Sequence, residues 1–176
     1  MTIDAPAGFR LIVDEPGDGQ RNMAVDEALL AHAAEAGPTI RLYGFRPPTL
    51  SVGRLQPLRP GPDGPGLLGP AGLQRLRDDG ITLVRRPTGG QAVLHDRELT
   101  YAVVLGRSHV QPFGKREIYR FVASLLVRGL LLLGIAGQPS RDRRGGLRQP
   151  DCFRATGEYE IASAAQRKLI GSAQLL

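Results

Sequence analysis

Tryptophan is absent from this chain of 176 residues, and all aromatic residues together make up 5% of it. Apolar residues still account for 41%, which is enough for the core of one globular domain. That core must consist mainly of Leu, Val, Ile and Ala. The single cysteine excludes a disulfide framework within the chain and favours a reducing compartment.

Long hydrophobic runs are also missing. The longest apolar stretch, residues 121–135, is interrupted by serine, arginine and glycine, so it is too short and too broken to span a bilayer. The first eight residues lack a basic region followed by an apolar run, so no secretory signal is recognisable. We therefore expect a cytoplasmic protein that makes no contact with a membrane.

Acidic residues are outnumbered by basic ones, and the formal net charge is +6. Three explanations for this charge stay open: a bias in the amino-acid composition of the source organism, contact with nucleic acid, or contact with an acidic protein. The arginines are not interleaved with aromatic residues, so we expect no nucleic-acid partner. Four arginines gather between Arg141 and Arg148. The surrounding segment is either a solvated loop or a contact for an acidic partner.

Hydrophobic periodicity and turn residues predict a mixture of strands and helices without strict alternation. This favours an α+β fold, with mixed or antiparallel sheets packed against helices, over a doubly wound fold. A Pro/Gly-rich surface loop is expected over 57–72. The strands are expected at 9–13, 39–43, 49–52, 81–85 and 99–105, the helices at 22–36, 73–78 and 115–135, and a hairpin at 159–162 and 169–173.

The most informative stretch runs from Val84 to Val104. Two arginines meet a Pro-Thr turn and a Gly-Gly pair, and two short apolar runs follow, which predicts a strand, a glycine turn and a hairpin. Glycines let the backbone approach a ligand closely, and free N–H groups in such a turn stabilise an anion or an oxyanion. Arg85 and Arg86 are suited to pair a carboxylate or phosphate. A plain turn between strands is the alternative.

This stretch contains R-R-P-T-G-G-Q-A-V-L-H-D-R-E-L-T-Y, which closely resembles the signature of the lipoate-protein ligase and octanoyltransferase superfamily, to which the biotin ligases also belong. The resemblance covers most of the chain, in family order. It implies one catalytic domain of the biotin/lipoate ligase type over residues 1–176. The other matching blocks are Asn22–Leu30, Leu42–Phe45, Thr49–Gly53 and Arg167–Gln174.

The resemblance also implies that a further strand and a C-terminal segment follow the last residues, Gly171–Leu176. We therefore expect this catalytic domain to be incomplete at its C-terminal end. A strand left at an open edge exposes unpaired backbone groups and invites aggregation. On that basis we expect the 176-residue chain to be poorly soluble and weakly active.

Cys152 is the candidate nucleophile. A lone cysteine is more often a small buried apolar residue than a nucleophile. Here it stands in a loop between polar neighbours, and Lys168 follows across the expected hairpin. An ammonium close to a thiol favours the thiolate, which is the reactive form.

The resemblance sharpens this hypothesis. Octanoyltransferases of the cysteine type carry Cys-Phe followed by Arg-Lys-x-x-Gly-Ser-Ala-Gln, in which the cysteine takes the acyl group as a thioester and the lysine lowers the pKa of its thiol. The lipoate ligases keep the lysine, activate lipoate as an adenylate and need no such cysteine. The presence of both Cys152 and Lys168 therefore indicates the cysteine branch. Gln91 agrees, because the ligases usually have a third glycine there.

For the remaining site residues, the resemblance implies that the glycine turn lines the slot for the acyl chain. His95 also fits a hydrogen-bonded structural residue at a strand end, and we do not expect it to be catalytic. Three histidines and one cysteine show no ligand spacing, so no metal site is expected. The residues expected to bind substrate are Arg86, Thr88, Gly89, Gly90, Gln91, His95, Gly171, Ser172 and Ala173.

The function implied is transfer of an octanoyl group from acyl carrier protein to a lysine of a lipoyl-domain protein. In this mechanism Cys152 attacks the thioester, Lys168 stabilises the thiolate, and backbone N–H groups hold the oxyanion. It requires no cofactor, neither ATP nor a metal. Three alternatives stay open: an amidotransferase between lipoyl carriers, an ATP-dependent lipoate ligase, and a non-catalytic basic binding module.

Overall fold

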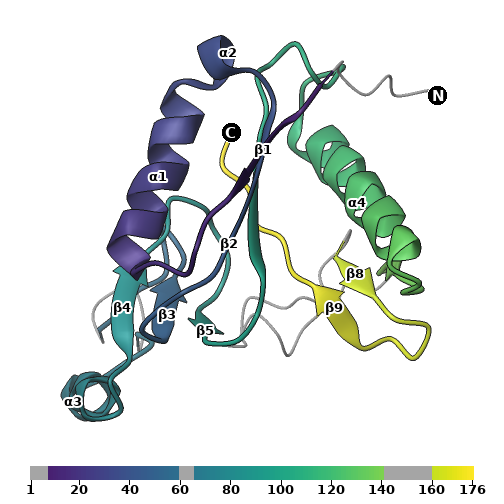
Figure 1. The fold of residues 1–176 in the computed structure, drawn as a ribbon. Helices are drawn as coiled ribbons and strands as arrows, with labels where there is room; N and C mark the ends of the chain where they lie inside the picture. The colour runs from purple at the N-terminus through teal and green to yellow at the C-terminus, as the bar shows by residue number, and fades with distance from the viewer. Residues whose placement is uncertain (1–7, 60–65, 141–159) are drawn as a thin grey trace. The chain divides into compact units, whose positions relative to one another are not determined.

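The structure is a computed structural model that describes residues 8–59, 66–140 and 160–176. By its internal packing the chain divides into two compact units, made mainly of Pro6–Gly106 and of Arg107–Gln174 (Figure 1). Each unit is described by itself. The expectation of one catalytic domain over residues 1–176 stays a prediction.

The first unit contains two three-stranded sheets. In the first sheet, β2 (Thr39–Tyr43) lies between a parallel neighbour, β1 (Arg10–Val13), and an antiparallel neighbour, β6 (Thr100–Val104). In the second sheet, β3 is flanked in the same way by β4 and β5. The bounds of these three strands are Thr49–Val52 for β3, Thr82–Arg85 for β4 and Val93–His95 for β5.

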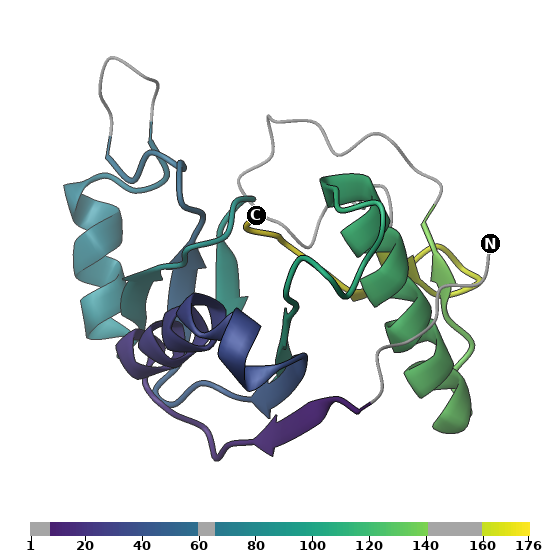
Figure 2. The ribbon, with the colours of Figure 1, turned by 90° about the horizontal axis from the view of Figure 1, so that it is seen from above.

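Helix α1 (Gly19–Ala31) begins where the carboxylate of Asp18 accepts a hydrogen bond from the backbone N–H of Arg21, at 2.9 Å. It contacts both sheets of its unit, at β4 and β6. A Cβ on Gly19 would lie 2.8 Å from Thr49, so this glycine lets the first turn pack closely. Figures 1 and 2 show α1 running beside the first sheet and continuing into the short α2 (Ala33–Ala36).

The sheet face under α1 carries a buried arginine, Arg41, which is 1% exposed. Its Nε donates to Asp14 at 2.7 Å and its Nη1 to Asp26 at 2.8 Å, while Nη2 donates to the Asn22 side chain at 2.9 Å. The Tyr43 hydroxyl donates to the other oxygen of Asp26 at 2.7 Å. Because two aspartates neutralise the buried cation, this network fixes α1 on β2.

The second sheet ends close to helix α3 (Pro70–Asp78), which contacts β4 and begins with proline at its first position. Figure 2 shows α3 beside that sheet. The apolar core of the unit is small. Met23, Tyr43 and Phe45 form its buried cluster, with Val84 and Ala102 packed against them.

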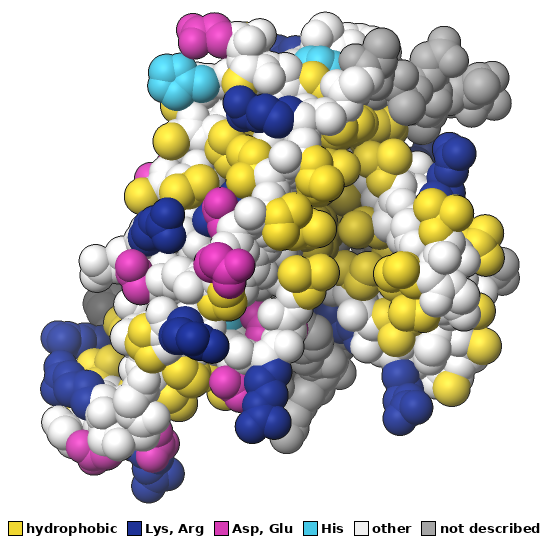
Figure 3. Space-filling view, in the orientation of Figure 1, with side chains coloured by type: hydrophobic (Ala, Val, Ile, Leu, Met, Phe, Trp, Pro, Cys, Tyr) yellow, Lys and Arg dark blue, Asp and Glu magenta, His cyan; other side chains and the backbone are white. Residues whose placement is uncertain are grey.

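The second unit combines helix α4 (Lys115–Leu132) with a short antiparallel sheet in the order β7-β8-β9. Phe121, Val122 and Ala123 are the buried residues of α4. Leucines near its C-terminal end are exposed, Leu132 by 90%, and Figure 3 shows hydrophobic side chains on this helix surface. The bounds of the strands are Gln138–Pro139 for β7, Ile161–Ala162 for β8 and Lys168–Ile170 for β9.

No helix in the described ranges is both long enough and apolar enough to cross a bilayer. The predicted α+β fold with mixed and antiparallel sheets is confirmed. One local prediction is wrong: the two apolar runs after the glycine turn do not form a hairpin with each other. Instead, β5 pairs with β3 and β6 pairs with β2, in different sheets. The polar segment between them carries the chain from one sheet to the other.

Candidate functional site

The glycine turn after β4 passes directly over the end of β3. The carbonyl of Thr88 accepts a hydrogen bond from the backbone N–H of Arg54 at 2.9 Å. A Cβ on Gly53 would collide with the carbonyl group of Gly90, and Gly90 itself has φ +92°. Gly53 is therefore required for this crossing. Gly53 is the last residue of the Thr49–Gly53 block, but the sequence pattern did not identify it as a site residue.

The guanidinium of Arg86 holds this turn from one side. Its Nη2 donates to the carbonyl oxygens of Gly89 and Gln91, both at 2.7 Å, and its Nε to Gly89 at 3.2 Å. Its Nη1 donates to the carbonyl and the hydroxyl of Ser51, at 3.2 and 3.1 Å. Arg86 thus joins the turn to β3. Pairing of this arginine with a bound anion stays a prediction.

The neighbouring Arg85 has a similar structural contact. Its Nη1 donates to the carbonyl oxygens of Gly53 at 2.6 Å and Gln56 at 2.9 Å, in the segment that follows β3. The side chain of Gln56 in turn donates to the side chain of Gln91 at 3.0 Å. Arg86 and Gln56 therefore fix the turn, and Arg85 fixes the segment after β3 that carries Gln56. The sequence did not predict these roles for the two arginines.

His95 lies at the end of β5 and has three well-defined neighbours. Its Nε2 is 2.9 Å from the Ser51 hydroxyl, its Nδ1 is 2.5 Å from a carboxylate oxygen of Glu98, and its ring stacks on Phe45 with centroids 4.1 Å apart. Burial lowers the pKa of His95, against the opposing effect of Glu98. The imidazole is therefore neutral near pH 7.

The proton positions follow from this charge state. Burial alone would raise the pKa of Glu98, but hydrogen bonds from the backbone N–H groups of Asp96 and Glu98 and from His95 outweigh it and lower that pKa. An ionised carboxylate accepts, so His95 donates through Nδ1 and accepts at Nε2 from the Ser51 hydroxyl. Arg86, Ser51, His95 and Glu98 thus form a continuous hydrogen-bonded chain, the Arg86–Glu98 chain.

The Ser51–His95–Glu98 part has the connectivity of a nucleophile, its base and an orienting acid. Ser51 is only 1% exposed, however, and its oxygen accepts from the Arg86 guanidinium at 3.1 Å. A hydroxyl that is buried and bonded to a cation is unsuited to attack a substrate. The geometry instead supports a structural, hydrogen-bonded histidine, as the sequence suggested for His95.

Lys168 lies at the start of β9 in the second unit. Its Nζ donates to Glu160 at 2.8 Å, and the two side chains are 4% and 9% exposed. A Cβ on Gly171 would lie 2.9 Å from Cε and 3.2 Å from Nζ of Lys168. The Arg-Lys-x-x-Gly spacing thus puts a residue without a side chain against the lysine. Glu160 was not predicted, although it lies within the strand expected over 159–162.

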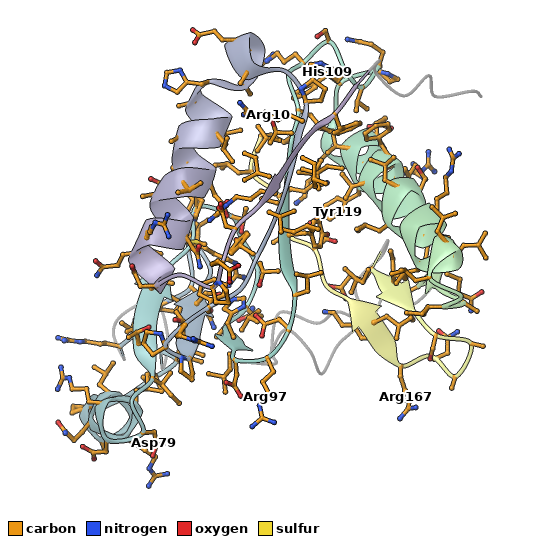
Figure 4. The ribbon with its side chains drawn as sticks, viewed as in Figure 1. Arg10, Asp79, Arg97, His109, Tyr119 and Arg167 are labelled. Atoms are coloured by element: carbon orange, nitrogen blue, oxygen red, sulfur yellow. The ribbon has the colours of Figure 1, made fainter. Side chains whose placement is uncertain are left out.

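The structure also describes other residues of the Arg167–Gln174 block. Ser172 is partly buried and Ala173 is exposed, both directly after β9. The side chain of Arg167, next to Lys168, is exposed and points away from the strand in Figure 4. Cys152 and the arginines between Arg141 and Arg148 lie outside the described residues. The expected approach of Cys152 to Lys168 and to the glycine turn therefore stays a prediction.

Comparison with known proteins gives a consistent result. The family model described as the lipoyl protein ligase A/B catalytic domain matches residues 18–176. The chain is 42% identical over 175 residues to octanoyltransferase LipM of Kyrpidia tusciae, 40% over 172 to that of Moorella thermoacetica, and 39% over 167 to that of Staphylococcus aureus. These alignments cover 94%, 94% and 89% of the chain, but only 60%, 59% and 57% of the relatives' length.

Solved structures agree on the fold. A crystal structure of lipoate-protein ligase A bound with ATP matches 95% of this chain with a TM-score of 0.72 and 25% identity, over 61% of its own length. A bipartite lipoate protein ligase from Thermoplasma acidophilum matches with a TM-score of 0.68 and 23% identity, covering 95% of this chain and 56% of its own. The chain therefore belongs to the lipoyl protein ligase A/B catalytic domain family.

Proposed function

We propose that this chain is the catalytic part of an octanoyltransferase that moves an octanoyl group from acyl carrier protein to a lysine of a lipoyl-domain protein. One observation carries the proposal: a family member with a buried, paired Lys168 also has a Cys-Phe pair, Cys152-Phe153, that resembles the one of the cysteine-type enzymes. The names of the relatives, all octanoyltransferase LipM at about 40% identity, support the same activity.

The chemistry takes place in two acyl transfers. The Cys152 thiolate attacks the carbonyl carbon of the donor thioester, the carbon–sulfur bond to the carrier breaks, and the carrier leaves as a thiolate that takes up a proton. The neutral amine of the acceptor lysine then attacks the Cys152 thioester. An amide forms, the amine gives up a proton, and the Cys152 thiolate is restored. No ATP is consumed, because the donor thioester already carries an activated acyl group.

The mechanism also needs a surface along which the acyl chain can lie. The Gly89–Gly90 part of the glycine turn offers such a surface without side chains. Arg86 fixes the carbonyl groups of Gly89 and Gln91, while the Cβ position of Gly89 has no atom within 4 Å. A linear apolar chain can lie against such a backbone surface without steric hindrance. This supports the expected role of Thr88–Gln91 in lining the acyl slot.

A transfer assay without ATP tests the proposal. Purified protein is mixed with octanoyl-acyl carrier protein and a lipoyl domain, and the octanoyl-lipoyl domain is quantified by mass spectrometry. We expect product from the wild type and none above background from Cys152→Ala, with Arg97→Lys, which is 94% exposed, as a matched surface control. Product from Cys152→Ala at the wild-type rate would contradict the proposal.

The same assay separates the alternatives. Activity only with ATP and free octanoate or lipoate would indicate a ligase. Activity only when a second octanoylated lipoyl carrier replaces acyl carrier protein as donor would indicate an amidotransferase. No product with any donor would leave a binding module as the explanation.

A further inference from the structure

We infer that Glu160 is the positioning residue for the reactive lysine, so that the acid–base group of this enzyme is a Glu160–Lys168 pair and not Lys168 alone. This inference rests on the proposed function for its catalytic consequence. The structural part, that Glu160 holds the Lys168 side chain in place, can be tested without any acyl substrate.

Burial is the first reason. A charged side chain taken out of water is stable only when it is paired and hydrogen-bonded. The side chains of Lys168 and Glu160 are 4% and 9% exposed, and their charged atoms lie 2.8 Å apart. At that distance the two groups form a charge-assisted hydrogen bond, which fixes the direction in which Nζ of Lys168 points.

Backbone placement is the second reason. Ile161 pairs with Ile170 across the antiparallel β8–β9 sheet. Continuing this register places Glu160, directly before β8, opposite Gly171, directly after β9. The carbonyl of Glu160 accepts a hydrogen bond from the backbone N–H of Ser140 at 2.6 Å. Glu160 directly precedes β8 and is bonded through its carbonyl to Ser140, directly after β7, which suits a residue that must orient another.

Gly171 completes the arrangement. A Cβ at this position would lie 2.9 Å from Cε of Lys168, 3.2 Å from Nζ, and 3.8 Å from the Glu160 carboxylate. The lysine stem therefore lies against bare backbone, and its otherwise flexible four-carbon chain is confined between Gly171 and Glu160. This contact gives a physical reason for the glycine three residues after the lysine in the Arg-Lys-x-x-Gly block.

The chain is well suited to a direct test, because Lys115 and Lys168 are its two lysines. Lys115 is exposed at the start of α4 and serves as an internal standard. Both amines are labelled with acetic anhydride over a range of pH, and each labelled peptide is quantified by mass spectrometry. The rate for Lys168 relative to Lys115 reports how far its amine is shielded by its buried, hydrogen-bonded position.

We expect Glu160→Gln to raise the relative labelling rate of Lys168 by about tenfold, the effect of losing one charge-assisted hydrogen bond. Glu160→Asp, which keeps the charge, should restore most of the protection. Gly171→Ala should raise labelling in the same direction by displacing the lysine stem. Glu35→Gln, at a side chain that is 82% exposed, should change nothing.

In the transfer assay, Glu160→Gln should lower kcat by about tenfold with little change in KM for the carrier, and Glu160→Asp should recover part of it. Unchanged Lys168 labelling in Glu160→Gln would overturn the inference, whatever the activity. A wild type that transfers no octanoyl group would overturn the proposed function, while the labelling result would still decide the role of Glu160.

Discussion

The Nε2 atom of His95 lies 2.9 Å from the hydroxyl oxygen of Ser51, and this hydrogen bond joins β5 to β3 beneath the glycine turn. The same hydroxyl accepts from Arg86, whose other nitrogens hold the carbonyl groups of Gly89 and Gln91. The shape of the expected acyl slot therefore depends on a buried polar chain that begins at Glu98.

Ser51→Ala interrupts this chain at its centre. The substitution removes the hydroxyl that donates to Nε2 of His95, which leaves a buried acceptor without that hydrogen bond and costs about 1–3 kcal/mol. The free energy of unfolding, measured by urea denaturation, should fall by that amount. Ser108→Ala, at an exposed serine, should change it by less than about 0.5 kcal/mol. Equal effects of the two substitutions would contradict the assigned role of Ser51.

His95 should make stability depend on pH in a defined window. Burial lowers its pKa in the folded protein below the ordinary value of 6.5, so the unfolded chain binds more protons just below pH 6.5. Folded-state stability should therefore decrease as pH falls from about 6.5 towards the folded pKa. Urea midpoints measured at successive pH values should show this slope in the wild type and lose it in His95→Gln.

Glu98 affects the stability of the fold over a separate pH range. Its pKa is lowered in the folded protein from the ordinary value of 4.5, so its contribution to stability is present above pH 4.5 and is lost as pH falls through the folded pKa. The slope that His95→Gln removes should therefore lie above the one that Glu98→Gln removes. A single slope near pH 4 in the wild type, with none above it, would contradict the assigned state of His95.

Gly53→Ala and Gly89→Ala should differ strongly in their effect on stability, although both glycines lie at the same crossing. Alanine at Gly53 would collide with the Gly90 carbonyl, and relief of the clash requires backbone movement. We expect it to lower the free energy of unfolding by about 2–4 kcal/mol, as overpacking against backbone does. At Gly89 the Cβ has open space, so stability should change by less than about 0.5 kcal/mol.

The activity of Gly89→Ala is then informative. If this position lines the acyl slot, a methyl group there should raise KM for the octanoyl donor while the urea midpoint stays at the wild-type value. Octanoyl transfer with wild-type kinetics in Gly89→Ala would show that the acyl chain does not approach this part of the turn.

Acyl carrier proteins are generally acidic, so we expect the arginines between Arg141 and Arg148 to steer association with the carrier. Reversing Arg143 and Arg144 to Glu is expected to slow association, and the difference from the wild type should shrink at high salt. Stopped-flow association rates at several ionic strengths measure this effect. The matched control reverses Arg75 and Arg77, two exposed arginines of α3, and should leave the rates close to wild type.

Local sequence patterns predicted much of this fold. The strands at Thr39–Tyr43 and Thr49–Val52 were predicted to the residue, because alternating residues and flanking turn residues define both. The resemblance indicated the family, which is confirmed. The wrong prediction concerned the partners of β5 and β6, because a hairpin and a crossover between sheets leave the same local pattern of two apolar runs separated by polar residues.

The site was less predictable, since its geometry depends on contacts between distant residues. A glycine is required at position 53 because the Gly90 carbonyl lies against it, and Glu160 has a proposed role only because it contacts Lys168. Neither relationship leaves a mark within a short window of sequence. The Arg86 contacts were missed for a similar reason: an arginine beside a glycine turn suggests an anion site, whereas here its donors bind carbonyl groups of the turn itself.

The most direct measurement of the thioester mechanism is intact-mass spectrometry of the protein after incubation with octanoyl-acyl carrier protein, without an acceptor. The wild type should gain the mass of one octanoyl group, and neutral hydroxylamine should remove it, as expected for a thioester. Peptide mapping should locate the group on Cys152, and Cys152→Ala should remain unmodified. An unmodified wild type that still transfers octanoyl to a lipoyl domain, or an equal mass gain in Cys152→Ala, would contradict a Cys152 thioester.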